Sequence, residues 1–229
     1  MTVQVTPSTD FVQALIGLVA GGASADEVAR HLLYANFERA RSTDPELAEM
    51  LRACAIPRRF DEKIIGVLRG APDDDERNRR LLDGVLSFSF VLARSDSGYV
   101  YHDSTRDLIL SDWAKEEDRG LYTQYNERLV EYYEARYEGE KRIEQDWMRV
   151  ADLIHRASRD RHRQLTLLIE ARIMAPLLEA LYHATLLSAG EGYAFFERYC
   201  FVYEAENRLT ACASLRTDGD SGPKVAQSR

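Results

Sequence analysis

The sequence has 229 residues, of which 45% are hydrophobic and 30% are charged, so it contains enough apolar material for one large domain or two small ones. Its formal net charge of -8 opposes passive attraction to nucleic acid or to an anionic membrane surface. The three cysteines, Cys54, Cys200 and Cys212, lie far apart and form no CxxC pair. This usage argues against a disulfide framework or a zinc site and favours a reducing, cytoplasmic location.

Residues 1–43 are predicted to form two N-terminal helices. The first is an apolar run over residues 11–20 that Gly21 and Gly22 stop, and the second is an amphipathic stripe from Asp26 onward. The apolar run resembles the core of a secretory signal, but Asp10 precedes it without any Lys or Arg. The run is also about half as long as a membrane span. We therefore expect no membrane partner.

Residues 44–113 are predicted to begin with three helices. Asp44-Pro45-Glu46 is a strong helix start, because proline fits the first helical position and acidic groups suit the positive end of the helix dipole. A second short helix is predicted to close at Gly70. The acidic residues 73–76 are predicted to form a loop, with a third helix from about Arg77 to Ser87.

A β-hairpin is predicted to follow these helices. Phe88, Phe90 and Leu92 alternate with smaller residues, which is the period-two pattern of a strand. Residues 95–98 form a suitable turn, and Tyr99-Val100-Tyr101 is rich in β-formers. The predicted order is thus three helices, a strand, a wing and a second strand.

Residues 114–213 are predicted to form a helical arm. Apolar residues recur at helical spacing along this region, and the pattern favours antiparallel helix pairs. Degenerate, TPR-like repeats fit the spacing, although no exact internal period occurs. Residues 214–229 have little apolar content and are predicted to be a disordered tail. The fold class is therefore mainly α, with the arm as a repeat-like second part.

Three segments resemble the winged-helix domain of STAND NTPases, the class that includes NB-ARC proteins and related bacterial regulators. They are Leu51 to Asp61, Leu81 to Val91, and Tyr101-His102-Asp103 with Arg106-Asp107. The resemblance covers about Leu32 to Trp113. A weaker similarity continues through Tyr132-Tyr133 and residues 179–183 into the helical arm that commonly follows in bacterial members.

The resemblance implies that His102 and Asp103 are nucleotide-sensor residues. In the family, a His-Asp pair after the wing closes over the ADP phosphates, and here Tyr101 stands where that motif has Met. An imidazole can donate a hydrogen bond to a phosphate oxygen, so the chemistry is reasonable. The alternatives are that His102 is a partly buried residue at a strand end and that Asp103 is an ordinary helix N-cap.

The sequence departs from the family because no GxxxxGK[ST] segment occurs. The phosphate cradle and magnesium site of a P-loop enzyme are therefore missing, and we expect no ATP hydrolysis by this chain alone. ADP or ATP would be met only with a nucleotide-binding domain in cis or in trans. We expect a split or truncated member or a fragment, acting as a non-catalytic signal-transduction module whose partner is that domain or another protein.

A DNA-binding winged helix is the main alternative, and a helical-repeat scaffold is another. In the DNA reading, Arg77, Arg79 and Arg80 would touch phosphates, together with Arg94 beside the wing. However, residues 44–113 contain 10 Lys and Arg against 14 Asp and Glu, a net charge of -4. That sign is wrong for a protein whose DNA affinity comes from released counterions.

The arm offers weaker candidates. Arg161 and Arg163 belong to a basic cluster that would fit an acidic partner or RNA, although interleaved Asp residues favour a solvated helix face. Tyr137 is predicted to be exposed and available to a partner. His155 and His162 lie two turns apart, too far for one metal ion, so no metal site is predicted.

Overall fold

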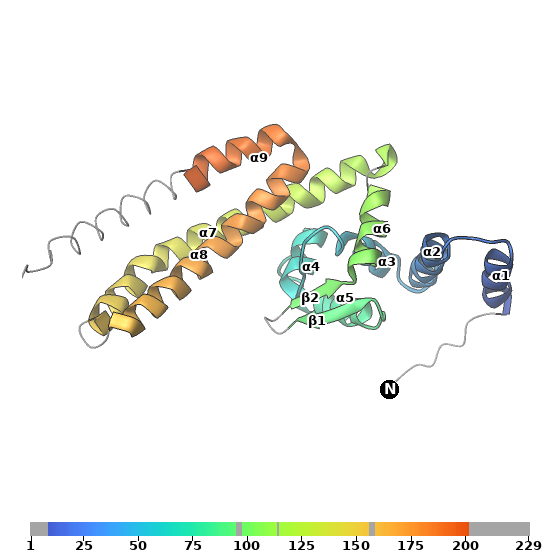
Figure 1. The fold of residues 1–229 in the computed structure, drawn as a ribbon, viewed down its shortest axis with the longest axis horizontal. Helices are drawn as coiled ribbons and strands as arrows, with labels where there is room; N and C mark the ends of the chain where they lie inside the picture. Colours follow the sequence, from blue (N-terminus) through green and yellow to red (C-terminus); the bar gives the residue numbers. More distant parts are fainter. Residues whose placement is uncertain (1–8, 95–97, 114, 156–158, 202–229) are drawn as a thin grey trace, which may run out of the picture. The chain divides into compact units, whose positions relative to one another are not determined.

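The computed structural model describes residues 9–94, 98–113, 115–155 and 159–201, and the chain divides into two compact units. One unit ends at Tyr125 and the other begins at Asn126. The described residues are mainly helical with one small antiparallel sheet, which confirms the predicted mainly α class (Figure 1). Each unit is described separately below.

Among its described residues, the first unit contains six α-helices, a hairpin, a 3₁₀ turn over Glu116–Asp118 and the start of a seventh α-helix. In chain order the six helices and the hairpin strands are α1 (Thr9–Ala20), α2 (Ala25–Thr43), α3 (Pro45–Ala53), α4 (Glu62–Arg69), α5 (Asp75–Leu86), β1 (Val91–Arg94), β2 (Gly98–Tyr101) and α6 (Asp103–Trp113). The strands pair antiparallel, with Val91 opposite Tyr101 and Arg94 opposite Gly98. An extended bridge joins Phe60, between α3 and α4, to Tyr99 of β2. The predicted succession of three helices and a hairpin is therefore observed.

Aspartate N-caps begin three of these helices. Asp44 accepts the backbone N–H groups of Glu46 and Leu47 at α3, Asp61 caps α4, and Asp74 caps α5. Since α5 starts at Asp75, the expected loop over residues 73–76 is wrong in its second half. Acidic groups in a first turn stabilise the positive end of the helix dipole, and here they extend the helix instead of interrupting it.

The start of the first strand also differs from the expectation. β1 begins at Val91, so Phe88 and Phe90 precede it. Their rings lie 5.5 Å apart between centroids, and Phe90 packs edge-on against Tyr101 at 5.4 Å. The alternation of Phe88 and Phe90 reflects aromatic packing around the hairpin base, which a period-two pattern does not distinguish from a longer strand.

The core of the first unit lies among α3, α4, α5, α6 and the hairpin. Its largest fully buried side chains are Met50, Leu51, Ile56, Phe60, Ile65, Leu68, Leu81, Ile109, Trp113 and Tyr125. Gly66 permits the close approach of α4 to the start of α5, because a Cβ there would lie 2.7 Å from Asn78 Nδ2 and 3.0 Å from Pro72 Cα. Gly70 ends α4 with a φ of 70°, a left-handed conformation that glycine adopts without strain.

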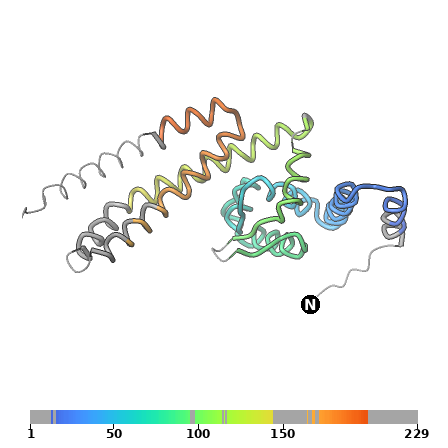
Figure 2. The backbone as a smooth tube through the Cα atoms, in the orientation of Figure 1, coloured from blue at the N-terminus to red at the C-terminus, as the bar shows by residue number. Residues whose placement is uncertain are grey.

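The second unit contains most of α7 (Arg119–His155), together with α8 (Arg159–Leu187), α9 (Ala189–Phe195) and a π-helical turn over Phe196–Phe201. Asn126 contacts His183, and Glu140 contacts Arg172, so α7 and α8 run antiparallel (Figure 2). The two helices have 37 and 29 residues. A repeat-like, TPR-like organisation of the arm stays a prediction, and residues 214–229 lie outside the described residues.

Tyr137 corrects one expectation about this unit. Its side chain is buried, 3% exposed, and its ring packs edge-on against Tyr199 with centroids 5.6 Å apart. The physical reason is visible in the spacing, since Leu129, Tyr133 and Tyr137 follow one another at intervals of four on one face of α7 and all three are buried. The apolar stripe simply continues one step further than expected.

Candidate functional site

His102 lies at the junction of the hairpin and α6. Its backbone N–H donates to the Phe90 carbonyl at 2.9 Å, and its carbonyl accepts the Arg106 N–H at 2.9 Å. His102 therefore occupies the N-cap position of α6, and its side chain is exposed. The alternative of a partly buried histidine at this strand end is wrong.

Asp103 is the first residue of α6 and is exposed in its first turn. The expectation that Asp103 is the N-cap is wrong by one position, because the first hydrogen bond of the helix starts from the His102 carbonyl. A carboxylate in the first turn still interacts favourably with the helix dipole. It also places a negative charge beside the imidazole, so an anion bound at this helix end would meet the Asp103 carboxylate as well.

An aromatic cluster fixes the backbone on the strand side of His102. Tyr101 is 3% exposed and packs against Phe60 and Phe90, with centroid distances of 5.3 and 5.4 Å. Its hydroxyl donates to the Leu51 carbonyl at 2.9 Å. Burial raises the pKa of Tyr101 well above its ordinary value, so the phenol stays a neutral donor. Tyr101 thus anchors the hairpin to α3.

Arg106 fixes the helix side of His102. Its Nε donates to the Ala55 carbonyl at 2.9 Å and its Nη2 to the Ile56 carbonyl at 3.1 Å. These carbonyls lie between α3 and α4, outside both helices, so a side-chain donor can satisfy them. Sequence reasoning did not identify this role, because a single arginine at the start of a helix gives no signal of the distant carbonyls that it contacts. Tyr101 and Arg106 together hold the His102 backbone from both sides.

The predicted DNA-contact residue Arg77 lies in an ion-pair network instead of on a free surface. Its Nε contacts Glu46 at 2.7 Å, and its Nη2 contacts both oxygens of Asp44 at 2.8 Å. Arg69 contacts the other Glu46 oxygen at 2.7 Å and also contacts Asp74 at 3.1 Å. The network joins the starts of α3 and α5 to the end of α4.

The charges in this network stabilise one another. Partial burial raises the pKa of Glu46, but hydrogen bonds and charges from Arg69 and Arg77 outweigh it, so the pKa lies below the ordinary value. The hydrogen bond to Glu46 is the largest influence that raises the pKa of Arg77. A guanidinium engaged by two carboxylates would have to break these contacts to meet a phosphate, which argues against the DNA role of Arg77.

The other proposed DNA contacts are exposed. Arg80 pairs with Glu76 one turn earlier on α5, Arg79 lies on the same helix, and Arg94 ends β1. Side chains of Arg161 and Arg163 lie outside the described residues, so their assignment as partner contacts stays a prediction. The exposed arginines of α5 are therefore accompanied by neighbouring carboxylates, as the net charge of the region predicts.

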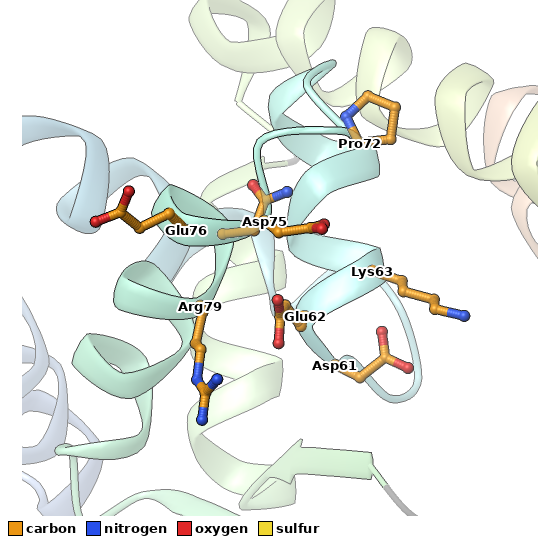
Figure 3. A pocket seen from close by; sticks show the side chains of 8 residues that line it. Asp61, Glu62, Lys63, Pro72, Asp75, Glu76 and Arg79 are labelled. Carbon is orange, nitrogen blue, oxygen red and sulfur yellow. The ribbon is translucent and has the colours of Figure 1, made fainter.

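A groove of about 680 Å³, lined mostly by charged residues, opens between the starts of α4 and α5. It is lined by Asp61, Glu62, Lys63, Pro72, Asp75, Glu76, Asn78 and Arg79. Figure 3 shows the Glu62 and Asp75 side chains between the two helices. Four carboxylates against two cations give the groove a negative balance, which repels phosphate groups. It lies at the end of α5 that a DNA-reading winged helix turns toward the bases.

The described residues offer few groups for covalent or metal chemistry. Cys54 is 2% exposed, and burial raises the pKa of its thiol, so it behaves as a core residue as predicted. No group of three or more His, Cys, Asp or Glu side chains in the described part of the chain is arranged to hold a metal ion. Nor does any helix there combine the length and apolar character that crossing a bilayer requires.

Comparison with known proteins gives no match to a family model, to a curated protein or to a solved structure. Functional inference for this chain therefore depends on the geometry above and on the sequence resemblance.

Proposed function

We propose that this chain is a non-catalytic regulatory module of a STAND-type signalling system, in which α3 to β2 form a winged helix that docks on a nucleotide-binding domain. The observation that carries the proposal is His102, an exposed imidazole held at the N-cap of α6 directly after the hairpin. It occupies the place in the element order that the family's sensor histidine would occupy.

The arrangement around the hairpin supports the winged-helix part of the proposal. Three short helices precede β1 and β2, and Phe60 adds an extended bridge to Tyr99 through hydrogen bonds of 2.9 and 2.8 Å. The bridge attaches the hairpin to the α3–α4 connection, so the hairpin is an integral part of the core. A hairpin fixed in this way provides a defined edge for docking.

The exposed His102 imidazole supports the nucleotide part, whereas the Asp103 carboxylate beside it opposes an anion. First-turn N–H groups of a helix and an imidazole both donate hydrogen bonds, and phosphate oxygens accept them. A nucleotide held by the partner domain would accept a hydrogen bond from His102 in one nucleotide state and lack that bond in the other. Such a difference in contacts between the ADP and ATP states is what shifts a two-state equilibrium.

In this proposal, the antiparallel helices of the second unit act as the arm that contacts further proteins. The contact between Arg172 of α8 and Glu140 of α7 at 2.7 Å and the buried Asn126–His183 hydrogen bond hold the two helices together. Ile143 of α7 and Leu167, Leu168 and Leu178 of α8 are exposed, and apolar side chains of this kind are available for contact with a partner. The arm needs no catalytic group to act in this way.

The test begins with the coding region next to this chain, which should encode a Walker A segment in the same frame or in an adjacent gene. Association of the chain with that P-loop polypeptide is then measured with ADP for wild type and for His102→Ala. Loss of one hydrogen bond to a charged group predicts roughly tenfold or greater weakening.

Asp107→Asn is the matched control, because Asp107 is also exposed on α6 and lies one turn beyond Asp103. It should leave the affinity within about threefold, as most exposed substitutions do. Equal weakening by both variants, or no effect of His102→Ala, would contradict the sensor role. The lack of any adjoining Walker A segment would contradict the hypothesis that this chain is part of a split or truncated STAND protein.

A further inference from the structure

Asp112, near the end of α6, is a buried carboxylate that three other side chains share. It is 4% exposed, although aspartate is rarely buried unless it is paired. Tyr34 donates its hydroxyl to Oδ2 at 2.5 Å, Arg30 contacts Oδ1 at 3.4 Å, and Lys115 contacts Oδ1 at 3.0 Å. The four residues are called the Asp112 node below.

The partners in the Asp112 node come from two separate segments. Arg30 and Tyr34 lie one turn apart on α2, whereas Lys115 lies in the short connection between α6 and α7. Lys115 also faces the Tyr34 hydroxyl. One carboxylate therefore contacts both α2 and the approach to α7.

Further contacts, next to the Asp112 node, join α3 to the end of α6 and to the connection before α7. Trp113 donates its Nε1 to the Arg52 carbonyl at 3.1 Å, and the Arg52 guanidinium lies 4.4 Å from the centre of the Trp113 ring. Arg52 also contacts Asp118 at 2.5 Å, just before α7 begins. Contacts from α3 and α2 thus converge on the end of α6 and on the connection that joins it to α7.

Two kinds of contact hold α2. Leu33, Phe37 and Ala40 are buried, which is apolar and non-directional packing. Arg30 and Tyr34, on either side of Leu33 in the sequence, contact the Asp112 carboxylate. Polar contacts of defined geometry are lost with small displacements, whereas apolar packing tolerates them. The contacts of Arg30 and Tyr34 with Asp112 are therefore the attachment of α2 that can change in one step.

We propose that the Asp112 node is a conformational coupling element, through which loss of the contacts between α2 and Asp112 loosens the start of α7. When a buried carboxylate loses one partner, its remaining partners must stabilise the negative charge. The Tyr34 and Lys115 contacts with Asp112 are therefore energetically linked. The inference concerns contacts within this chain alone and does not depend on a nucleotide-binding partner.

Amide hydrogen exchange of the full chain tests the coupling through two reciprocal variants. Tyr34→Phe removes only the hydroxyl donor of α2, and it should accelerate exchange in residues 119–125 by roughly tenfold. Lys115→Met should accelerate exchange in residues 28–34 by a similar factor, because thermodynamic coupling is reciprocal. The double variant should show less than the sum of the two effects on a logarithmic scale.

Tyr193→Phe is the matched control, because Tyr193 is 64% exposed on α9 and makes no part of the node. It should leave exchange in both segments unchanged. The inference is overturned when each variant accelerates exchange only in its own segment, or when the two effects add fully in the double variant. Both single variants keep the Asp112 carboxylate, so the test does not require the more disruptive loss of the node itself.

Discussion

The two units of the chain are stabilised by different kinds of contact. In the first, side chains bind backbone carbonyls far away in the sequence, as Tyr101 does with Leu51, 50 residues earlier, and Trp113 does with Arg52, 61 residues earlier. In the second, Leu129, Tyr133 and Tyr137 form a periodic stripe along α7. The stability of the first unit therefore depends on individual side-chain contacts, whereas that of the second depends on apolar side chains at regular helical spacing.

The largest expected effect is at Phe60, which is 1% exposed and packs against Tyr99 and Tyr101. Phe60→Ala should lower the free energy of unfolding of the first unit by about 3–5 kcal/mol, because it removes a buried ring and leaves a cavity. Urea denaturation followed by tryptophan fluorescence measures this, in a Trp147→Phe background that leaves Trp113 as the only tryptophan. Phe196→Ala, at a 38% exposed site in the second unit, should cost less, and equal costs would contradict the contrast.

Removal of the Arg106 guanidinium should have the next largest effect. Arg106→Met keeps part of the aliphatic stem but deprives the Ala55 and Ile56 carbonyls of their donor, at a cost of about 1.5–3 kcal/mol. The same urea experiment measures the loss. Arg79→Met is the control on an exposed face and should change stability by less than about 0.5 kcal/mol. Similar losses in both variants would show that Arg106 contributes no specific hydrogen bonds.

The Asn126–His183 pair tests the comparison in the second unit. It is a specific polar contact between α7 and α8, whose other buried contacts include the apolar stripe of α7. Both residues are fully buried, and His183 Nδ1 lies 2.9 Å from Asn126 Oδ1. Asn126→Leu alone should destabilise the arm by about 1–3 kcal/mol, because it removes a partner from a buried imidazole. Asn126→Leu with His183→Leu should recover much of that loss. Additive destabilisation in a thermal denaturation series would contradict this.

The smallest expected effect is the pH dependence at Asp112. Burial raises its pKa, but the Tyr34 and Lys115 contacts outweigh this and hold the pKa below the ordinary value of 3.8. Because the folded state holds the ionised form more strongly than the unfolded state, this stabilisation is present above about pH 4 and is lost as the pH falls further. Urea midpoints at pH 5 and pH 3 should differ less in Asp112→Asn than in wild type. An equal difference would contradict the assignment.

The sequence predicts features that depend on local chemistry. Asp44-Pro45 and Gly70 mark helix ends through short-range effects, and the order of three helices and a hairpin follows from periodicity. The four-residue spacing that buries Tyr137 is equally local, because Tyr137 follows Leu129 and Tyr133 on the same face of α7. The prediction that Tyr137 is exposed overlooks this spacing. The position of His102 at the end of β2 was also predictable from the pattern of strand followed by helix.

Features that depend on contacts between distant residues were not predictable. Nothing in the sequence pairs Arg106 with the carbonyls after α3, or Arg77 with Asp44 and Glu46, 33 and 31 residues away. The prediction that Arg77 contacts DNA therefore did not take its ion pairs with Asp44 and Glu46 into account. Side chains that bind across the fold have no periodic signature, so their roles appear only when the elements are placed in space.

The central proposal is that α3 to β2 act as a winged helix and dock on a nucleotide-binding domain in a nucleotide-dependent way. Isothermal titration of the full chain into the adjoining P-loop polypeptide, loaded first with ADP and then with a non-hydrolysable ATP analogue, measures this most directly. The account predicts clearly tighter binding in the ADP state, by at least about fivefold, the lower end of typical allosteric couplings. The same affinity in both states, or no binding in either, would contradict it.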